Sequence, residues 1–157
     1  MQTFVVDLST KGLDRLKQIL LGKQRWLERK TTEVCRRLAE LGATKAEVGF
    51  AAAYYDGPEE HEITVEPRGK GYAVVASGET VLFVEFGSGL IGYGHPEPHG
   101  MGPGTYPGAG HWDDPNGWYY GHGQHSHGNP PNMPMYNARK DIELELARIV
   151  KEVFGNA

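Results

Sequence analysis

Cysteine is nearly absent, because Cys35 is the single thiol among 157 residues. It cannot form an internal disulfide, which fits a reducing cytoplasm as the site of synthesis. Cys35 falls within a helical pattern, where a free cysteine commonly serves as a small apolar side chain. We therefore interpret it as a packing residue rather than a nucleophile.

Long apolar runs and an excess of positive charge are also lacking. No apolar stretch approaches the roughly 18 residues that indicate a transmembrane helix, so none is expected. The net charge is −4, whereas a dedicated nucleic-acid-binding domain is usually basic. Two common enzyme signals, a G-x-S-x-G nucleophile elbow and a Walker phosphate-binding loop, are missing as well.

The residues that are present are unevenly distributed. No Lys or Arg occurs between residues 71 and 138, so all 16 lie before or after that stretch. Residues 87–135 contain 13 of the 22 glycines, 8 of the 10 prolines and 6 of the 7 histidines. The sequence therefore predicts one domain over residues 1–157, with a charged helical start, a strand-rich middle, and a long loop before a charged helical end.

Two segments carry the apolar periodicity of amphipathic helices. In residues 9–41, apolar side chains recur at spacings of three, four or seven, Ser9 or Thr10 can cap the N-terminus, and Gly42 is a suitable stop. A second stripe runs through residues 136–154 at spacings of four, four, three and four. Both segments are predicted to be helices.

Four short segments between them read as strands. Residues 46–53 and 60–67 flank a turn at Asp56-Gly57-Pro58, and residues 71–76 and 80–86 are joined by a short hairpin connection at residues 77–79. This order predicts an α+β fold, in which an antiparallel sheet of about four strands packs on the helices. The long Gly/Pro/His-rich loop then occupies residues 87–135.

The glycines at the start of that loop match the G-x-G-x-x-G pattern, as GSGLIG at residues 87–92. A dinucleotide-binding turn needs a strand before this pattern and a helix after it. Pro96 and Pro98 disfavour helical geometry just downstream, so we expect that no helix starts at residues 89–92. We interpret the glycines as ending a strand and releasing the chain into the loop, not as binding a nucleotide.

The loop is unusually rich in aromatic residues, which are scarce in disordered segments and dominate interface energetics. We therefore expect it to order at least partly, against a partner. Glu85, in the apolar strand before the loop, is interpreted as an exposed edge or interface residue rather than a general base. The candidate subunit-interface residues are Glu85, Gly87, Gly89, Trp112, Trp118 and Tyr120.

Histidines suggest a second hypothesis. His122, His125 and His127 form an H-x-x-H-x-H pattern, and neutral imidazole is a common ligand of zinc, copper and nickel. The glycine-spaced loop provides no rigid scaffold to preorganise such ligands, so a polar, flexible loop remains the simpler interpretation. The alternative function is a metal-binding protein or metal-dependent enzyme that uses this loop.

The order of three motifs resembles a known family. V-x-F-V-E-F-G-S-G at residues 81–89 is followed by a Gly-, Trp- and Tyr-rich insertion with G-W-Y-Y at residues 117–120, and then by P-P-x-x-P-M-Y-N-A-R at residues 130–139. In this order they resemble the gene-product-ten tail-component family of long-tailed phages, of the HK ninety-seven type. The resemblance covers about residues 13–154, and the His-rich insertion and Met135 depart from it.

This resemblance implies a structural virion protein and not an enzyme, with no catalytic residues and no cofactor. The implied fold is a twisted antiparallel sheet with a long helix packed on it. The implied function is to join head and tail, as a neck, connector or tail-completion subunit that forms a homo-oligomeric ring. Its partners would be head-completion, portal-side, tail-terminator or tube proteins, and DNA would pass through the ring without specific binding. The protein would be made in the bacterial cytoplasm and incorporated into the virion, with no membrane involved.

Overall fold

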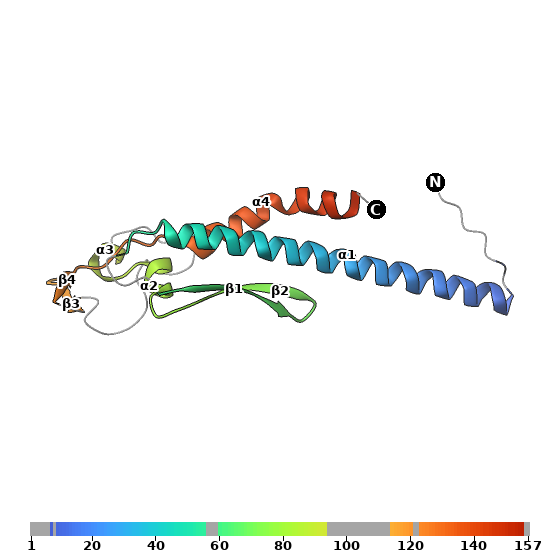
Figure 1. Cartoon of the computed structure of the whole chain (residues 1–157), viewed down its shortest axis with the longest axis horizontal. Helices are drawn as coiled ribbons and strands as arrows, with labels where there is room; N and C mark the ends of the chain where they lie inside the picture. The colour runs from blue at the N-terminus through green and yellow to red at the C-terminus, as the bar shows by residue number, and fades with distance from the viewer. Residues whose placement is uncertain (1–6, 8, 56–59, 94–113, 121–122, 156–157) are drawn as a thin grey trace.

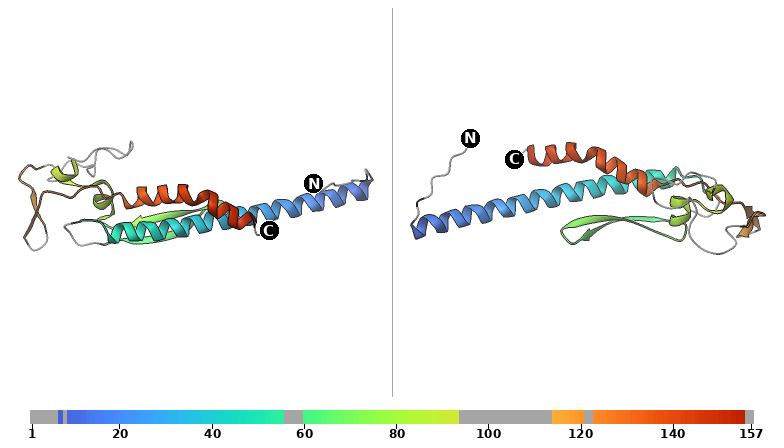
Figure 2. Two further views of the ribbon diagram at one scale, coloured as in Figure 1. Left: turned by 90° about the horizontal axis from the view of Figure 1, so that it is seen from above. Right: turned by 180° about the vertical axis from the view of Figure 1, so that it is seen from behind.

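The computed structural model describes residues 7, 9–55, 60–93, 114–120 and 123–155. One long helix, α1, runs along most of the molecule, and the other elements gather around its C-terminal half (Figure 1). A second helix, α4, lies along one side of α1, and a β-hairpin lies along another side (Figure 2). The elements are α1 Thr10–Ala51, β1 Glu62–Arg68, β2 Gly71–Ser77, α2 Val81–Phe86, α3 Gly89–Tyr93, β3 Trp118–Tyr120, β4 Gln124–Ser126 and α4 Pro134–Gly155.

Helix α1 is longer than predicted. It starts where expected, with the Ser9 hydroxyl accepting a hydrogen bond from the backbone N–H of Gly12 at 3.2 Å. It does not stop at Gly42, so the prediction of a strand over residues 46–53 is wrong. A Cβ on Gly42 would lie 2.5 Å from Cδ1 of Ile142 in α4. This glycine therefore allows two helices to approach closely instead of ending one of them.

The predicted strands at residues 60–67 and 71–76 are present, as β1 and β2, but they pair with each other. The antiparallel register runs from Glu62 opposite Ser77 to Arg68 opposite Gly71, and Gly69 adopts a φ of 60° in the turn. In the described residues the strands form two separate two-stranded sheets, β1–β2 and β3–β4. The prediction of one four-stranded sheet is therefore wrong, although the α+β class is confirmed.

Residues 80–86 were predicted to be a strand and instead contain helix α2. Its buried positions are Val81, Val84 and Glu85, at the spacings of three and four that belong to a helix face. A short apolar run can become either a strand or a buried helical turn, and here packing against the end of α1 favours the helix. Because α2 precedes the glycine pattern, the strand of a dinucleotide-binding turn is missing at this place.

A short helix also follows those glycines. Helix α3 begins at Gly89, which corrects the expectation that no helix could start at residues 89–92. Within the described residues it covers Gly89–Tyr93, so the prolines at positions 96 and 98 do not prevent a helix from starting here. The predicted loop over residues 87–135 thus contains α3, β3 and β4. The C-terminal helix is confirmed and begins at Pro134, two residues before the predicted start.

Two clusters of buried apolar side chains hold these elements together. The first joins α1 to α4 through Val34, Ile149 and Val153, with Leu38, Leu41 and Phe154 packed against it. The second, around Phe50, Val81 and Val84, joins the end of α1 to α2, the β1–β2 hairpin and the start of α4. Among the described helices, none combines the length and the apolar character that crossing a membrane requires.

Candidate interaction site

Glu85 does not lie at an exposed edge, and that expectation is wrong. Its side chain is only 4% exposed. Its carboxylate accepts hydrogen bonds from the backbone N–H groups of Met135 at 2.8 Å and Tyr136 at 3.0 Å. These donors belong to the first turn of α4, where N–H groups have no partner within the helix and the helix dipole favours negative charge. Glu85 therefore caps α4 from a neighbouring element.

The environment of Glu85 affects its ionisation in two opposing ways. Burial raises the pKa of the carboxyl above its ordinary value of 4.5, because the charged form loses solvation. The backbone N–H groups of Met135 and Tyr136 lower the pKa by a smaller amount. The role of Glu85 in the described structure is therefore to fix the start of α4.

Asn129 makes a second buried connection between the same two regions. It is 1% exposed. Its side-chain amide donates to the carbonyl of Phe83 at 2.9 Å, and its backbone exchanges two hydrogen bonds with Ser88, at 2.9 and 3.1 Å. Residues 81–89 and 129–136 are thus joined directly, although about 40 positions separate them. Sequence reasoning recognised residues 81–89 and 130–139 as motifs but gave Ser88 and Asn129 no role, because no local pattern shows which residues bond across that distance.

Some of the glycines and tryptophans predicted to form the subunit interface are neighbours in the structure. Gly87 ends α2 with a φ of 77°, and Gly89 has a φ of 61°. A Cβ on Gly89 would lie 2.5 Å from the carbonyl oxygen of His127 and 2.8 Å from the Trp118 ring. Gly89 and Trp118 therefore pack against each other within one chain. Trp112 and the side chain of Tyr120 lie outside the described residues, so the predicted set is only partly brought together.

Two of the three candidate metal-binding histidines are neighbours. The rings of His125 and His127 are 4.7 Å apart between centroids. Nε2 of His125 lies 2.7 Å from the carbonyl oxygen of Asn116, which can only accept, so Nε2 is the donor in this hydrogen bond. His122 lies outside the described residues. In the part of the chain that is described, no group of three or more His, Cys, Asp or Glu side chains could hold a metal ion.

The N-terminal part of α1 extends past the end of its partner helix. Near that end, the Lys30 ammonium donates to the carbonyl of Val153 at 2.7 Å, and Trp26 meets Phe154 edge-to-face at 5.7 Å. Beyond this point no other described element lies beside α1 (Figure 2). We call residues 10–30 the arm, whose last turn still contacts the end of α4 through Trp26 and Lys30.

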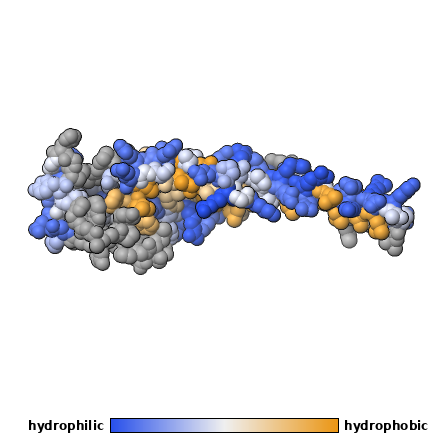
Figure 3. Space-filling view, turned by 90° about the horizontal axis from the view of Figure 1, so that it is seen from below, coloured by the Kyte–Doolittle hydropathy of each residue, from blue (hydrophilic) through white to orange (hydrophobic). Residues whose placement is uncertain are grey.

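The arm carries apolar residues on the same helix face that α4 covers further along. Leu13 is 49% exposed and Leu20 is 57% exposed, while Leu16 between them is half-buried. They continue the spacing that leads to Val34 in the α1–α4 cluster. Figure 3 shows apolar surface on the projecting end of the molecule, with largely polar surface between it and a second apolar area nearer the other end. We call Leu13, Leu16 and Leu20 the arm stripe.

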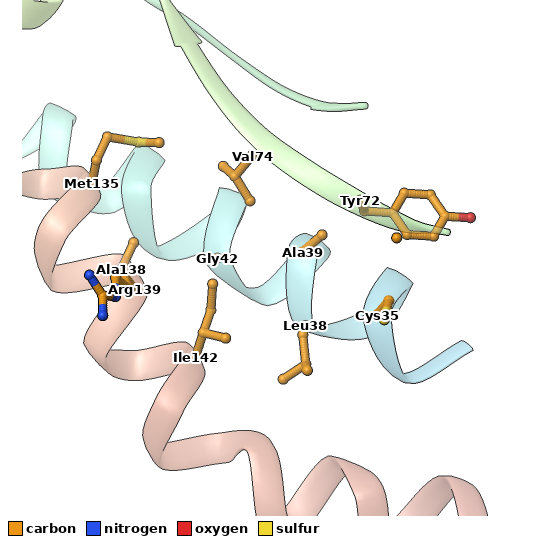
Figure 4. Close-up of a pocket in the computed structure, with 11 residues that line it drawn as sticks. Cys35, Leu38, Ala39, Gly42, Tyr72, Val74, Met135, Ala138, Arg139 and Ile142 are labelled. Carbon is orange, nitrogen blue, oxygen red and sulfur yellow. The ribbon is translucent and has the colours of Figure 1, made fainter. Parts of the chain in front are cut away.

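An apolar groove lies on the body of the molecule, between α1, β2 and α4 (Figure 4). It has a volume of about 390 Å³. One charged residue, Arg139, is among the described residues that line it, and its guanidinium is paired with Glu143 at 3.0 Å. The apolar lining includes Cys35, Leu38 and Gly42 from α1, Tyr72 and Val74 from β2, and Ile142 from α4.

Charge is separated along the molecule. The arm has seven basic and two acidic residues, a net charge of +5, so the rest of the chain has a net charge of −9. Four exposed glutamates lie on or next to the β1–β2 hairpin, at Glu60, Glu62, Glu66 and Glu79. The arm is thus a basic, partly apolar projection from an acidic body.

Comparison with known proteins found no match for this chain. The chain matches no protein-family model, no curated protein and no solved structure.

Proposed function

We propose that this chain is a structural subunit that assembles with copies of itself into a ring. We further propose that the ring joins the head and tail of a tailed phage, as a neck, connector or tail-completion component of the virion. Its neighbours would be head-completion, portal-side, tail-terminator or tube proteins. The observation that carries the proposal is the arm, whose apolar stripe continues past its partner within the chain.

An uncovered apolar stripe of this kind favours an assembly role over an enzymatic one. Soluble monomers rarely expose contiguous apolar surface, and such surface usually marks a contact with another molecule. The α1–α4 cluster shows how this face of α1 is buried when a partner is available. The simplest function for the exposed continuation is to be buried by another chain.

The contact between the two motif segments supports the phage assignment. Residues 81–89 and 130–139 are two of the three motifs that resemble the phage tail-component family. Glu85 joins the first motif to the second through buried hydrogen bonds, and Asn129, just before the second motif, also bonds to the first. These two motifs thus form one structural unit, as a scaffold for an assembling subunit requires. This unit leaves the arm free to project.

The decisive experiment is electron microscopy of lysates from the phage that carries this gene, with the gene interrupted by a stop codon. The proposal expects filled heads lying apart from finished or over-long tails. A plasmid copy of the intact gene should restore joined particles. Normal joined particles without the plasmid would overturn the phage function.

Metal binding is the second candidate function, and it is favoured by the contact between the His125 and His127 rings. If it is correct, untagged protein should bind one equivalent of zinc in a calorimetric titration. The His125→Ala/His127→Ala double variant should lose that binding. The single variant His61→Ala removes a histidine outside this region and provides the matched control. Equal binding by wild-type protein and the double variant would remove this candidate.

A further inference from the structure

We propose that the arm of one copy docks into the apolar groove of a second copy, with the arm stripe facing the groove. This inference rests on the proposed self-assembly and specifies how it occurs. The contact is heterologous, because each copy contributes an arm on one side and a groove on the other. A chain of such contacts forms a ring when its rotation closes.

The two surfaces match in chemistry and in length. The arm stripe presents leucines, and the groove is lined mainly by apolar side chains with Gly42 at its floor. Leu13 and Leu20 are seven residues apart on α1, as are Cys35 and Gly42 in the groove. Each interval spans about 10 Å at the helical rise of 1.5 Å per residue. Two arm leucines can therefore meet positions next to Cys35 and Gly42 at the same time.

Charge selects this arrangement over pairing between two arms. Two arms side by side would bring together two segments of net charge +5. At physiological ionic strength, charges closer than about 8 Å are only partly screened, so the arms would repel each other. An arm placed on a second body instead meets an apolar groove, where the charged residue among the described lining, Arg139, is already paired with Glu143, so less like charge is brought together.

The docking has to occur between copies and cannot occur within one. Leu20 and Cys35 lie on the same continuous helix. Fifteen residues separate them, which is about 22 Å along a straight helix. A disulfide requires Cα atoms within about 7 Å of each other, so these positions can be bridged only from one copy to another.

Cys35 allows a direct test, because the sole native thiol lines the groove. We would make Leu13→Cys, Leu16→Cys and Leu20→Cys separately, oxidise each purified protein, and separate the products on non-reducing gels. At least one variant should give a ladder of covalent dimers, trimers and larger species. Each copy then holds one arm thiol and one groove thiol, so heterologous bridging propagates.

Two matched controls define the result. Gln18→Cys places an exposed thiol on the opposite face of the arm and should give no ladder. Adding Cys35→Ser to the variant that forms a ladder should abolish every covalent product. If that double variant still forms a covalent dimer, the arms pair with each other and the proposal is wrong.

Light scattering on the wild-type protein separates failure of this inference from failure of self-assembly. If the protein forms oligomers but none of the three cysteine variants forms a disulfide, arm-to-groove docking is wrong and self-assembly still stands. The arm stripe would then bind another kind of partner, such as a different protein or a nucleic acid. A wild-type protein that stays monomeric at every concentration would overturn both self-assembly and this docking.

Discussion

At the scale of single residues, Glu85 determines whether α4 can begin where it does. Replacing Glu85 with Ala removes the carboxylate that accepts hydrogen bonds from the backbone N–H groups of Met135 and Tyr136 in a buried site. Leaving buried donors unsatisfied destabilises a protein by about 1–3 kcal/mol each. We expect Glu85→Ala to lower the free energy of unfolding by at least that amount, measured by urea denaturation. Glu143→Ala, which removes an exposed glutamate from α4, should change it by less than about 1 kcal/mol.

The raised pKa of Glu85 predicts how the free energy of unfolding depends on pH. The folded chain holds the proton of Glu85 to a higher pH than the unfolded chain, so the folded state binds more protons between the two pKa values. The stability contributed by this effect is fully present below the unfolded pKa and is lost as pH rises through the folded pKa.

The measurement compares wild-type protein with Glu85→Gln, whose side chain does not titrate. The free energy of unfolding of wild type relative to this variant should fall as pH rises above about 4.5 and then level off. A relative stability that increases over the same interval would show that the hydrogen bonds outweigh burial, contrary to the direction inferred here.

At the scale of elements, two glycines in α1 have opposite roles. Gly42 lies against Ile142 and Val74, whereas a Cβ on Gly22 would meet no atom within 4 Å. We expect Gly42→Leu to separate α1 from α4 and to destabilise the fold by about 1–3 kcal/mol, as overpacking usually does. Gly22→Ala should be neutral or stabilising by up to about 1 kcal/mol, because alanine favours a helix interior. Thermal unfolding followed by circular dichroism would compare the two, and equal effects would contradict the close packing at Gly42.

The elements also show what could be predicted from the sequence. The two long helices were recognisable because apolar spacing repeats over many turns. Residues 46–53 and 80–86 were misassigned because short apolar runs fit either a strand or a helical turn. Phe50, Val81 and Val84 pack on one another, and that contact decides in favour of helix. Glu85 was singled out as an exposed edge or subunit-interface residue, whereas its hydrogen-bond partners are Met135 and Tyr136, about 50 positions away in the same chain. A one-dimensional pattern carries no information on that contact.

At the scale of the whole molecule, the structure is a rod with a basic end and an acidic body. The arm of one copy has a net charge of +5, and the remainder of another copy has a net charge of −9, so the two attract each other. The Debye length sets the distance over which this attraction acts. That length shrinks from about 10 Å at 0.1 M salt to about 3 Å at 1 M. Assembly should therefore weaken as salt concentration rises, even though the contact itself is apolar.

Light scattering at fixed protein concentration can follow this dependence in sodium chloride. We expect the average mass of wild-type assemblies to fall between about 0.1 and 1 M salt, as screening removes the attraction. A triple variant, Lys11→Glu/Arg15→Glu/Lys17→Glu, lowers the arm charge by six units and leaves the arm stripe unchanged. This variant should assemble poorly at low salt and gain mass as salt is added, because screening then reduces repulsion. If added salt instead strengthened wild-type assembly, like charges would be meeting at the contact, as they do when two arms pair, and the charge argument for arm-to-body docking would fail.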